Sequence, residues 1–289
     1  MSPVVAIVAP GNMGAAVGRR LAENGVKVIT TLAGRGAASV ARATAAGMTD
    51  VALDRLVEAE IVLSILPPAQ ALPFAEQMAP LLLAAERKPV FVDCNAVNPE
   101  TVRKIAAVVA GTAAGADASF VDASIIGLPP KPGQASPHIY VCGESTARAR
   151  VLILGKCGLD VRVLDGAVGA ASALKMSYAG INKGVAALAS AMILAAARSG
   201  ATEALYREMS ESLPGLLQSL RRQVPDMLPK AYRWVAEMRE IAAFAAEDAA
   251  AHKVFEGFSE LFERVSRDVA AEKVESAVLT GFFESLNKA

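Results

Sequence analysis

Short apolar runs separated by longer Ala-rich stretches fill the first half of the chain. The runs at residues 4–9, 26–30, 61–66 and 90–93 have the length and β-branched content of buried strands, and the segments between them have helical spacing. This alternation of strand and helix predicts an α/β domain with a mostly parallel sheet and right-handed crossovers. Further runs at residues 120–126, 139–142 and 159–164 would extend the sheet.

The pattern changes near residue 165. Beyond it the β-branched runs stop, and helical periodicity interrupted by Pro214, Pro225 and Pro229 takes over. A chain of 289 residues also exceeds the usual size of a single hydrophobic core. We therefore predict an α/β domain at residues 1–165 and an all-α domain at residues 166–289.

Charge and hydropathy exclude two classes of partner. The 29 basic and 29 acidic side chains cancel, and no block of like charge forms the basic stripe of a nucleic-acid-binding protein. The apolar run at residues 184–197 lies between Lys183 and Arg198 and is too short to span a bilayer. The first residues lack a charged leader and a cleavage site. We expect a cytoplasmic protein that binds neither nucleic acid nor membrane.

Cysteine and histidine content argues against a disulfide framework and a metal centre. Cys94, Cys142 and Cys157 are odd in number and far apart in the sequence. His138 and His252, the two histidines, are not part of a metal-ligand pattern. We expect no metal site and no Ser-His-Asp apparatus.

The first predicted strand leads into a glycine-containing turn and then a helix. Gly11 would let the backbone approach a pyrophosphate, Gly14 would let helix and strand pack closely, and Asn12 and Met13 complete the turn. Ala9 replaces the first glycine of the usual dinucleotide-binding pattern, and such a turn also occurs for packing alone. Its place at the start of an α/β domain favours a dinucleotide-binding Rossmann domain.

The end of the second predicted strand bears on which dinucleotide binds. NAD-dependent enzymes usually carry an acid there to hold the ribose hydroxyls. This chain has no acid between Glu23 and Asp50, whereas Thr31 and Arg35 follow the strand and can bind a 2′-phosphate. NADP is therefore favoured over NAD. The alternative is that Arg35 is only a solvated loop cation.

A lysine stands in an apolar, small-residue stretch at the start of the second domain. At about 100° per residue, Lys175, Tyr178, Ala179 and Asn182 share one face of a helix. A lysine in such a stretch is either functional or a snorkelling or ion-paired structural residue. Spacing alone leaves both interpretations open.

At this point the sequence resembles the superfamily of β-hydroxyacid dehydrogenases and 6-phosphogluconate dehydrogenase. Five motifs occur in register: the glycine turn, Leu66-Pro67, residues 93–99 (DCNAVNP), residues 122–127 (DASIIG) and residues 169–175 (GAASALK). Residues 229–238 (PKAYRWVAEM) are most similar to a branch with a phosphogluconate-dehydrogenase-like C-terminal domain. The match spans nearly the whole chain.

The resemblance implies roles for several residues. Lys175 corresponds to the general acid/base, and Asn95 to a residue beside the nicotinamide. A turn around the substrate carboxylate would comprise Ser124, Ile125, Ile126 and Gly127. The resemblance also implies a homodimer formed through the helical domain, with active sites between subunits.

Three departures from the family pattern narrow the substrate. Ile126 stands where a serine is expected, and Ala179 where an asparagine is expected. Asn182 occupies the catalytic position at which 6-phosphogluconate dehydrogenase has a glutamate. These changes argue against 6-phosphogluconate and against ordinary 3-hydroxyisobutyrate-type substrates.

Two further candidates come from the C-terminal half. Arg239 aligns with a family lysine near the cofactor. Trp234 is the only tryptophan and stands in a cluster with Lys230, Tyr232 and Arg233 that is rich in anion-binding and aromatic groups. Trp234 contacts the substrate in one interpretation and anchors the helical core in the other.

These observations predict an NADP-dependent oxidoreductase acting on CH–OH groups. It would transfer a hydride between nicotinamide and a small hydroxy acid or its carbonyl product, with Lys175 moving the hydroxyl proton. One alternative is an imine reductase, because those enzymes share the architecture and often lack the lysine. The other is a non-catalytic NADP-binding sensor.

Overall fold

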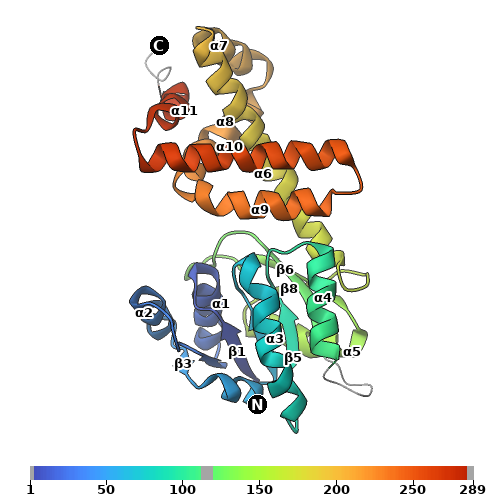
Figure 1. Cartoon of the computed structure of the whole chain (residues 1–289). Coiled ribbons are helices and arrows are strands. Elements are labelled where there is room, and N and C mark those ends of the chain that lie inside the picture. Colours follow the sequence, from blue (N-terminus) through green and yellow to red (C-terminus); the bar gives the residue numbers. More distant parts are fainter. Residues whose placement is uncertain (1–2, 112–119, 285–289) are drawn as a thin grey trace. The chain divides into compact units, whose positions relative to one another are not determined.

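The computed structural model describes residues 3–111 and 120–284 and divides into two compact units (Figure 1). The first unit comprises residues 1–175 and the second residues 176–289. The sequence places the domain boundary after residue 165. The structure divides within the helix that begins the second half of the chain, α6, at Ala170–Arg198.

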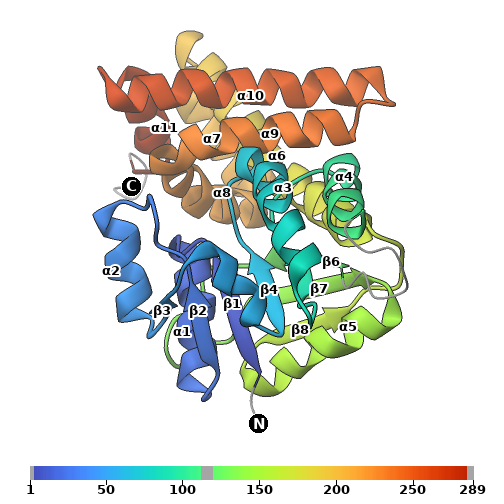
Figure 2. The same cartoon turned by 60° about the horizontal axis from the view of Figure 1, so that its bottom comes forward.

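The first unit contains one eight-stranded sheet in the order β3-β2-β1-β4-β5-β6-β7-β8. Neighbouring strands are parallel except for the antiparallel pair β6–β7, which confirms the predicted mostly parallel sheet. β3, β2, β1 and β4 lie side by side in Figure 2. The strands are β1 Val4–Val8, β2 Lys27–Thr30, β3 Thr49–Asp50, β4 Ile61–Ser64, β5 Val90–Asp93, β6 Phe120–Ile126, β7 His138–Gly143 and β8 Asp160–Val163.

Alternating side chains of the central strands pack against helices on the two faces of this sheet. Along β1, Val5 and Ile7 belong to one core cluster, whereas Ala6 and Val8 belong to the other. The first cluster includes residues of α1, α2 and α5, and the second includes residues of α3 and α4. The helices are α1 Asn12–Glu23, α2 Ala37–Ala45, α3 Pro68–Ala84, α4 Pro99–Ala110 and α5 Ser145–Val151, with 3₁₀ helices η1 Leu53–Glu58 and η2 Leu152–Cys157.

The strand order creates a switch point in the first unit. From β1 the chain proceeds outward through β2 to β3 and then returns to β4 on the other side of β1. In such sheets ligands bind in the crevice outside the carboxyl ends of the strands at this point. The glycine turn follows β1, Leu66-Pro67 follows β4 and Asn95 follows β5, so all three lie at the carboxyl edge of the sheet.

The second unit is all helical, as predicted. Its helices α9 and α10 lie alongside each other (Figures 1 and 2). Pro225 lies inside α8 and does not end that helix. After α6 the elements are α7 Thr202–Ser212, α8 Pro214–Met227, η3 Leu228–Lys230, α9 Ala231–Phe244, α10 Ala249–Ala270 and α11 Val274–Glu284.

Helix α6 is longer than the apolar run visible in the sequence. By length and composition alone, it is the one helix among residues 3–111 and 120–284 that could cross a membrane. The core helix of a soluble domain has the same properties. Ala186, Ala187 and Ser190 of α6 are fully buried.

Candidate functional site

The turn after β1 fits the phosphates of a dinucleotide. Helix α1 begins at Asn12, no side chain caps its N-terminus at Gly11, and its first turn contains no acid. A Cβ at Gly14 would lie 2.1 Å from the Ala9 carbonyl oxygen, whereas a Cβ at Gly11 would meet no described atom within 4 Å. Helix and strand therefore need Gly14 in order to pack. The space in front of the α1 N-terminus is open for an anion.

Asn95 joins the ends of β4 and β5 by hydrogen bonds. Its Oδ1 accepts from the Leu66 amide at 2.5 Å, and its Nδ2 donates to Ser64 Oγ at 2.9 Å and Asp93 Oδ2 at 2.7 Å. The residue is 1% exposed. The side-chain amide is therefore engaged within the edge of the sheet, and the implied place of Asn95 beside a nicotinamide stays a prediction. Pro67, next to Leu66, is exposed at the start of α3.

The region after β2 contains a cation that the sequence analysis did not single out. Thr31 is nearly buried and Arg35 is partly exposed. Arg42 in α2 turns back to the glycine turn, where its Nε donates to the Pro10 carbonyl oxygen at 3.0 Å, while its Nη2 donates to Ser39 Oγ at 3.0 Å. A basic residue in a surface helix is too common for its sequence position to have revealed this contact.

An acid also lies at the end of β2, contributed by the neighbouring strand. β3 pairs with β2 so that Asp50 is the register partner of Thr30. Asp50 Oδ1 accepts a hydrogen bond from the Leu32 amide at 2.8 Å. The prediction that the end of β2 lacks an acid is therefore corrected: none follows the strand in sequence before Asp50, but Asp50 itself lies at the strand end in space.

The segment predicted to form a turn around the substrate carboxylate is mostly strand. β6 continues through Ile126, and Ser124 and Ile125 are buried in it. Ser124 Oγ donates to the Ala171 carbonyl oxygen at 2.6 Å. The prediction of a turn from Ser124 is therefore corrected, since only Gly127, with φ 135°, lies beyond the strand in a turn conformation. Binding of a carboxylate at Ile126 and Gly127 stays a prediction.

Lys175 interacts electrostatically with two buried acids of neighbouring strands, Asp93 at the last position of β5 and Asp122 within β6. Burial lowers the pKa of Lys175, and electrostatic interactions with Cys94, Asp93 and Asp122 oppose that shift. Burial also raises the pKa of Asp93 to about 7. Both acids begin motifs of the family pattern, residues 93–99 and 122–127, but the sequence alone does not show that they lie near Lys175. Lys175 is partly buried and is therefore not an ordinary solvated surface charge, and its role in proton transfer stays a prediction.

The other α6 candidates belong to the second unit. Helix α6 runs unbroken through Lys175, Tyr178 and Asn182, so the helical spacing predicted from sequence is present. Tyr178 and Asn182 are exposed, and their roles stay predictions. Lys183 forms an ion pair with Glu237 and lies 5.0 Å from the centre of the Trp234 ring. Its charge is therefore partnered inside the helical unit.

Trp234 and Arg239 lie on α9. The Trp234 ring packs edge to face on Phe262, with the ring centres 5.2 Å apart. These contacts match the core-anchor interpretation of the tryptophan. Arg239 is exposed, and its Nη2 lies 3.9 Å from Glu263 Oε2. A role for either residue at the substrate or the cofactor stays a prediction.

Both histidines contact acids. His138 Nδ1 lies 2.8 Å from Asp160 Oδ2, and His252 Nε2 lies 3.2 Å from Glu256 Oε1. Within the described parts of the chain, no group of three or more His, Cys, Asp or Glu side chains could hold a metal ion. Each histidine therefore pairs with an acid, outside any such group in those parts of the chain.

The glycine turn, the switch point and the helical second half define the class of the protein. It is a nicotinamide-binding protein of the 3-hydroxyacid dehydrogenase type. Residues 4–165 match the NAD binding domain of 6-phosphogluconate dehydrogenase, so the chain belongs to this family. Residues 196–265 match a domain of unknown function (DUF1932).

Solved structures agree with this assignment. The conserved protein MTH1747, of unknown function and described as similar to 3-hydroxyacid dehydrogenases, is 27% identical, with a TM-score of 0.68, and the match covers 92% of this chain and 97% of that one. Mycobacterium tuberculosis 3-hydroxyisobutyrate dehydrogenase with L-serine has 18% identity, a TM-score of 0.62 and full coverage of both chains, at 100%. An imine reductase from Myxococcus stipitatus in complex with NADP+ has 16% identity and a TM-score of 0.53, covering 97% and 99%. No curated protein sequence matches significantly.

Proposed function

We propose that this protein is an NADP-dependent oxidoreductase that interconverts a small hydroxy acid and its carbonyl product. The observation that carries the proposal is the place of Lys175: it follows by three residues the Ser172 that Asp122 of β6 holds by a hydrogen bond, and burial lowers its pKa. A nicotinamide bound at the carboxyl edge of the sheet supplies or accepts the hydride. Oxidation of an alcohol also requires a base for the hydroxyl proton. Lys175 takes that proton during oxidation and returns it during reduction.

A substrate panel tests this proposal. We expect turnover when hydroxy acids are offered with NADP+ or semialdehydes with NADPH, measured by the absorbance of the reduced nicotinamide. Turnover of cyclic imines alone would instead favour an imine reductase, the activity named for one of the structural neighbours. NADPH binding without turnover of any compound would indicate a sensor.

The preference for NADP rests on positive charge after β2. Arg35 and Arg42 lie on the segment that follows this strand, and Arg42 is held at the glycine turn through the Pro10 carbonyl oxygen. Guanidinium groups bind phosphates with paired hydrogen bonds. The Asp50 carboxylate at the same strand end opposes a 2′-phosphate, so the arginines must outweigh it.

We expect NADPH to bind more tightly than NADH by about tenfold, the value of roughly one charge-assisted contact. Arg35→Ala should remove most of this difference, because Arg35 is the first cation after the end of β2 and is partly exposed. The matched control is Arg87→Ala, since Arg87 precedes β5 and lies at the opposite, amino edge of the sheet. Titration calorimetry with both cofactors measures the ratio. Equal affinities in the unsubstituted protein would contradict the preference.

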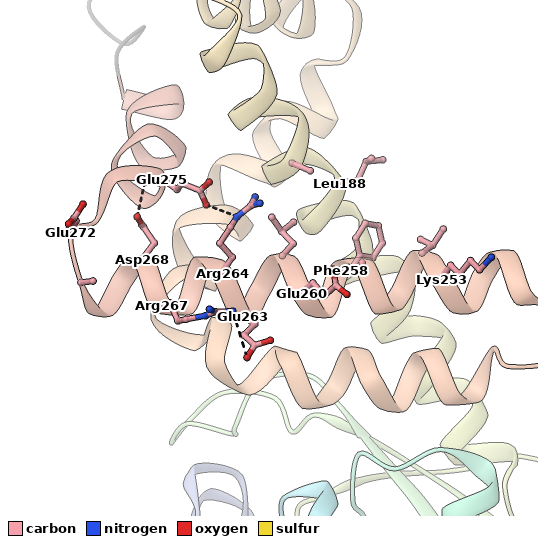
Figure 3. Close-up of a pocket in the computed structure, with 15 residues that line it drawn as sticks. Leu188, Lys253, Phe258, Glu260, Glu263, Arg264, Arg267, Asp268, Glu272 and Glu275 are labelled. Carbon is pink, nitrogen blue, oxygen red and sulfur yellow. Dashed lines mark hydrogen bonds and ion pairs between the residues drawn. The ribbon is translucent and has the colours of Figure 1, made fainter.

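We further propose that the helical unit forms a homodimer. Ile181, Leu188 and Met192 of α6 are 73%, 56% and 53% exposed, and their spacing places them in one stripe along the helix. Leu188 also borders a groove formed with α10 and the start of α11 (Figure 3). Exposed apolar stripes of this kind mark protein interfaces.

The charges around this groove favour a second copy of the chain as the occupant. Basic residues Arg264 and Arg267 lie in it together with acidic residues Glu260, Glu263 and Glu272 (Figure 3). In a two-fold dimer the same surface must complement itself, which a mixed-charge rim around an apolar stripe does. The family resemblance, which implies a dimer formed through the helical domain, points to the same unit of the chain.

Leu188→Asp should convert the dimer into a monomer, because it places a charge in the middle of the apolar stripe. Leu83→Asp is the matched control, since Leu83 is a 59% exposed leucine on α3 of the first unit. Light scattering after size-exclusion chromatography gives the mass at micromolar concentration. A monomeric unsubstituted protein would rule out the dimer, and a dimeric Leu188→Asp variant would place the interface elsewhere.

A further inference from the structure

The carboxylate of Asp122 caps the helix that carries Lys175. Asp122 lies on β6 and is fully buried. Its Oδ2 accepts hydrogen bonds from the amides of Gly169 at 2.8 Å and Ser172 at 3.2 Å, and its Oδ1 accepts from Ser172 Oγ at 2.8 Å. Helix α6 begins at Ala170, so Gly169 directly precedes the helix and Ser172 belongs to its first turn. The acid that satisfies this helix end is therefore contributed by a strand about fifty residues earlier.

Neighbouring groups hold the same turn in place. Ser124, two residues along β6 and on the same face, donates from Oγ to the Ala171 carbonyl oxygen at 2.6 Å. Cys142, the register partner of Asp122 on β7, has its Sγ 3.2 Å from Asp122 Oδ2 and accepts from the Ala171 amide at 3.2 Å. The first turn of α6 is thus tied to two adjacent strands of the sheet.

Lys175 follows Ser172 by three residues, which is slightly less than one helical turn. Its position over the sheet is consequently set by where the first turn of α6 is held. We infer that Asp122 is a positioning residue for Lys175, fixing its helix by the cap and keeping a negative charge beside the lysine. The effect of Asp122 on catalysis rests on the proposed function of Lys175, but its effect on the position and the pKa of Lys175 does not.

The negative charge of Asp122 should raise the pKa of Lys175. Burial lowers the pKa of Lys175, and Asp122 is one of the groups that raise it again. Asp93 and Cys94, at the end of β5, are the other titratable groups of the first unit that act on Lys175. Removing the Asp122 charge must therefore favour the neutral amine and move its titration to lower pH.

Competitive labelling of lysines tests the inference without any substrate. The full-length protein is treated with acetic anhydride at a series of pH values, and mass spectrometry measures labelling of the peptide that contains Lys175. For Asp122→Asn we expect the half-labelling pH of Lys175 to fall by about one pH unit, the usual scale for a nearby charge. Asp160→Asn is the matched control, because Asp160 pairs with Arg162 and His138 on β7 and β8 and should leave Lys175 unchanged.

Two outcomes would overturn the inference. The first is an unchanged half-labelling pH of Lys175 in a folded Asp122→Asn variant. If that variant also has a lower melting temperature, Asp122 stabilises the fold but does not act on Lys175. If Asp122→Asn does not fold, Ser172→Ala decides, because it removes one hydrogen bond to the acid and keeps the charge. In Ser172→Ala, amide hydrogen exchange at residues 170–175 should be about tenfold faster, because roughly one hydrogen bond is lost. Unchanged exchange is the second outcome that would overturn the inference.

The same variant separates this inference from the proposed function. With a turned-over hydroxy acid, Asp122→Asn should move the acidic limb of the kcat profile for oxidation to lower pH, in step with the labelling. If the labelling shift occurs but a Lys175→Met variant keeps full activity, Asp122 acts on Lys175 and the proposed catalytic role of Lys175 is wrong. A catalytically active protein without the labelling shift would reject the link alone.

Discussion

Replacing Lys175 with methionine should lower kcat by about 100-fold or more, the usual scale for loss of a general acid/base. Methionine has similar length and keeps the packing of α6, but it cannot accept or return a proton. NADPH affinity should stay nearly unchanged, because the glycine turn and the segment after β2 are untouched. Steady-state kinetics with the best substrate of the panel and calorimetry with NADPH measure the two effects.

The dependence of the oxidation rate on pH should also change in Lys175→Met. Alcohol oxidation requires the neutral amine, so its rate should rise with pH as the Lys175 ammonium loses its proton. Burial lowers the pKa of Lys175 and so moves this rise toward neutrality. In Lys175→Met the residual rate should no longer follow that limb.

Lys183→Met is the control on the same helix. Lys183 is paired with Glu237 and the Trp234 ring, so its loss should reduce stability and leave kcat within about threefold. Near-normal turnover of Lys175→Met, with an intact fold by circular dichroism, would remove Lys175 from the mechanism. The imine reductase alternative would then gain support.

Local patterns predicted the main elements of the fold. The runs at residues 90–93 and 120–126 coincide with β5 and β6, because strands that are buried on both faces are rich in apolar and β-branched residues, although β6 also contains the buried polar residues Asp122 and Ser124. The glycine turn was also predictable, since its conformation depends on neighbouring residues. β3 was not, because Thr49 and Asp50 are both exposed and the strand has only two residues.

The polar contacts of the candidate site were mostly beyond sequence reasoning. Asp50 reaches the end of β2 only through the pairing of β2 with β3. Arg42 reaches the glycine turn only because α2 folds back toward it. Asp122 binds the first turn of α6 although β7, α5, η2 and β8 lie between them in the sequence. Each of these contacts joins segments that are distant in sequence, and no local periodicity encodes them.

The two glycines of the turn should differ in a way that identifies the phosphate site. A Cβ at Gly14 would collide with the Ala9 carbonyl oxygen at 2.1 Å, so Gly14→Ala must displace the backbone. Overpacking of this kind costs about 3 kcal/mol. We therefore expect Gly14→Ala to lower the melting temperature and to abolish NADPH binding together.

Gly11→Ala should affect binding alone. Gly11 has φ −69° and ψ −172°, a conformation that alanine adopts readily, and its Cβ would meet no described atom within 4 Å. The melting temperature without cofactor should therefore stay the same. The added methyl group would project into the open space in front of α1, so the dissociation constant for NADPH should rise by at least about tenfold.

Gly215→Ala is the control for this pair, because Gly215 lies in α8 of the helical unit and a Cβ there also meets open space. Calorimetry with NADPH and thermal unfolding without it should leave this variant unchanged or slightly stabilised, as expected for alanine in a helix. Wild-type NADPH affinity in Gly11→Ala would show that the open space in front of α1 does not take the phosphates. In that case the glycine turn would serve only the packing of α1 on β1, and the anion site would have to be sought at Arg35 and Arg42.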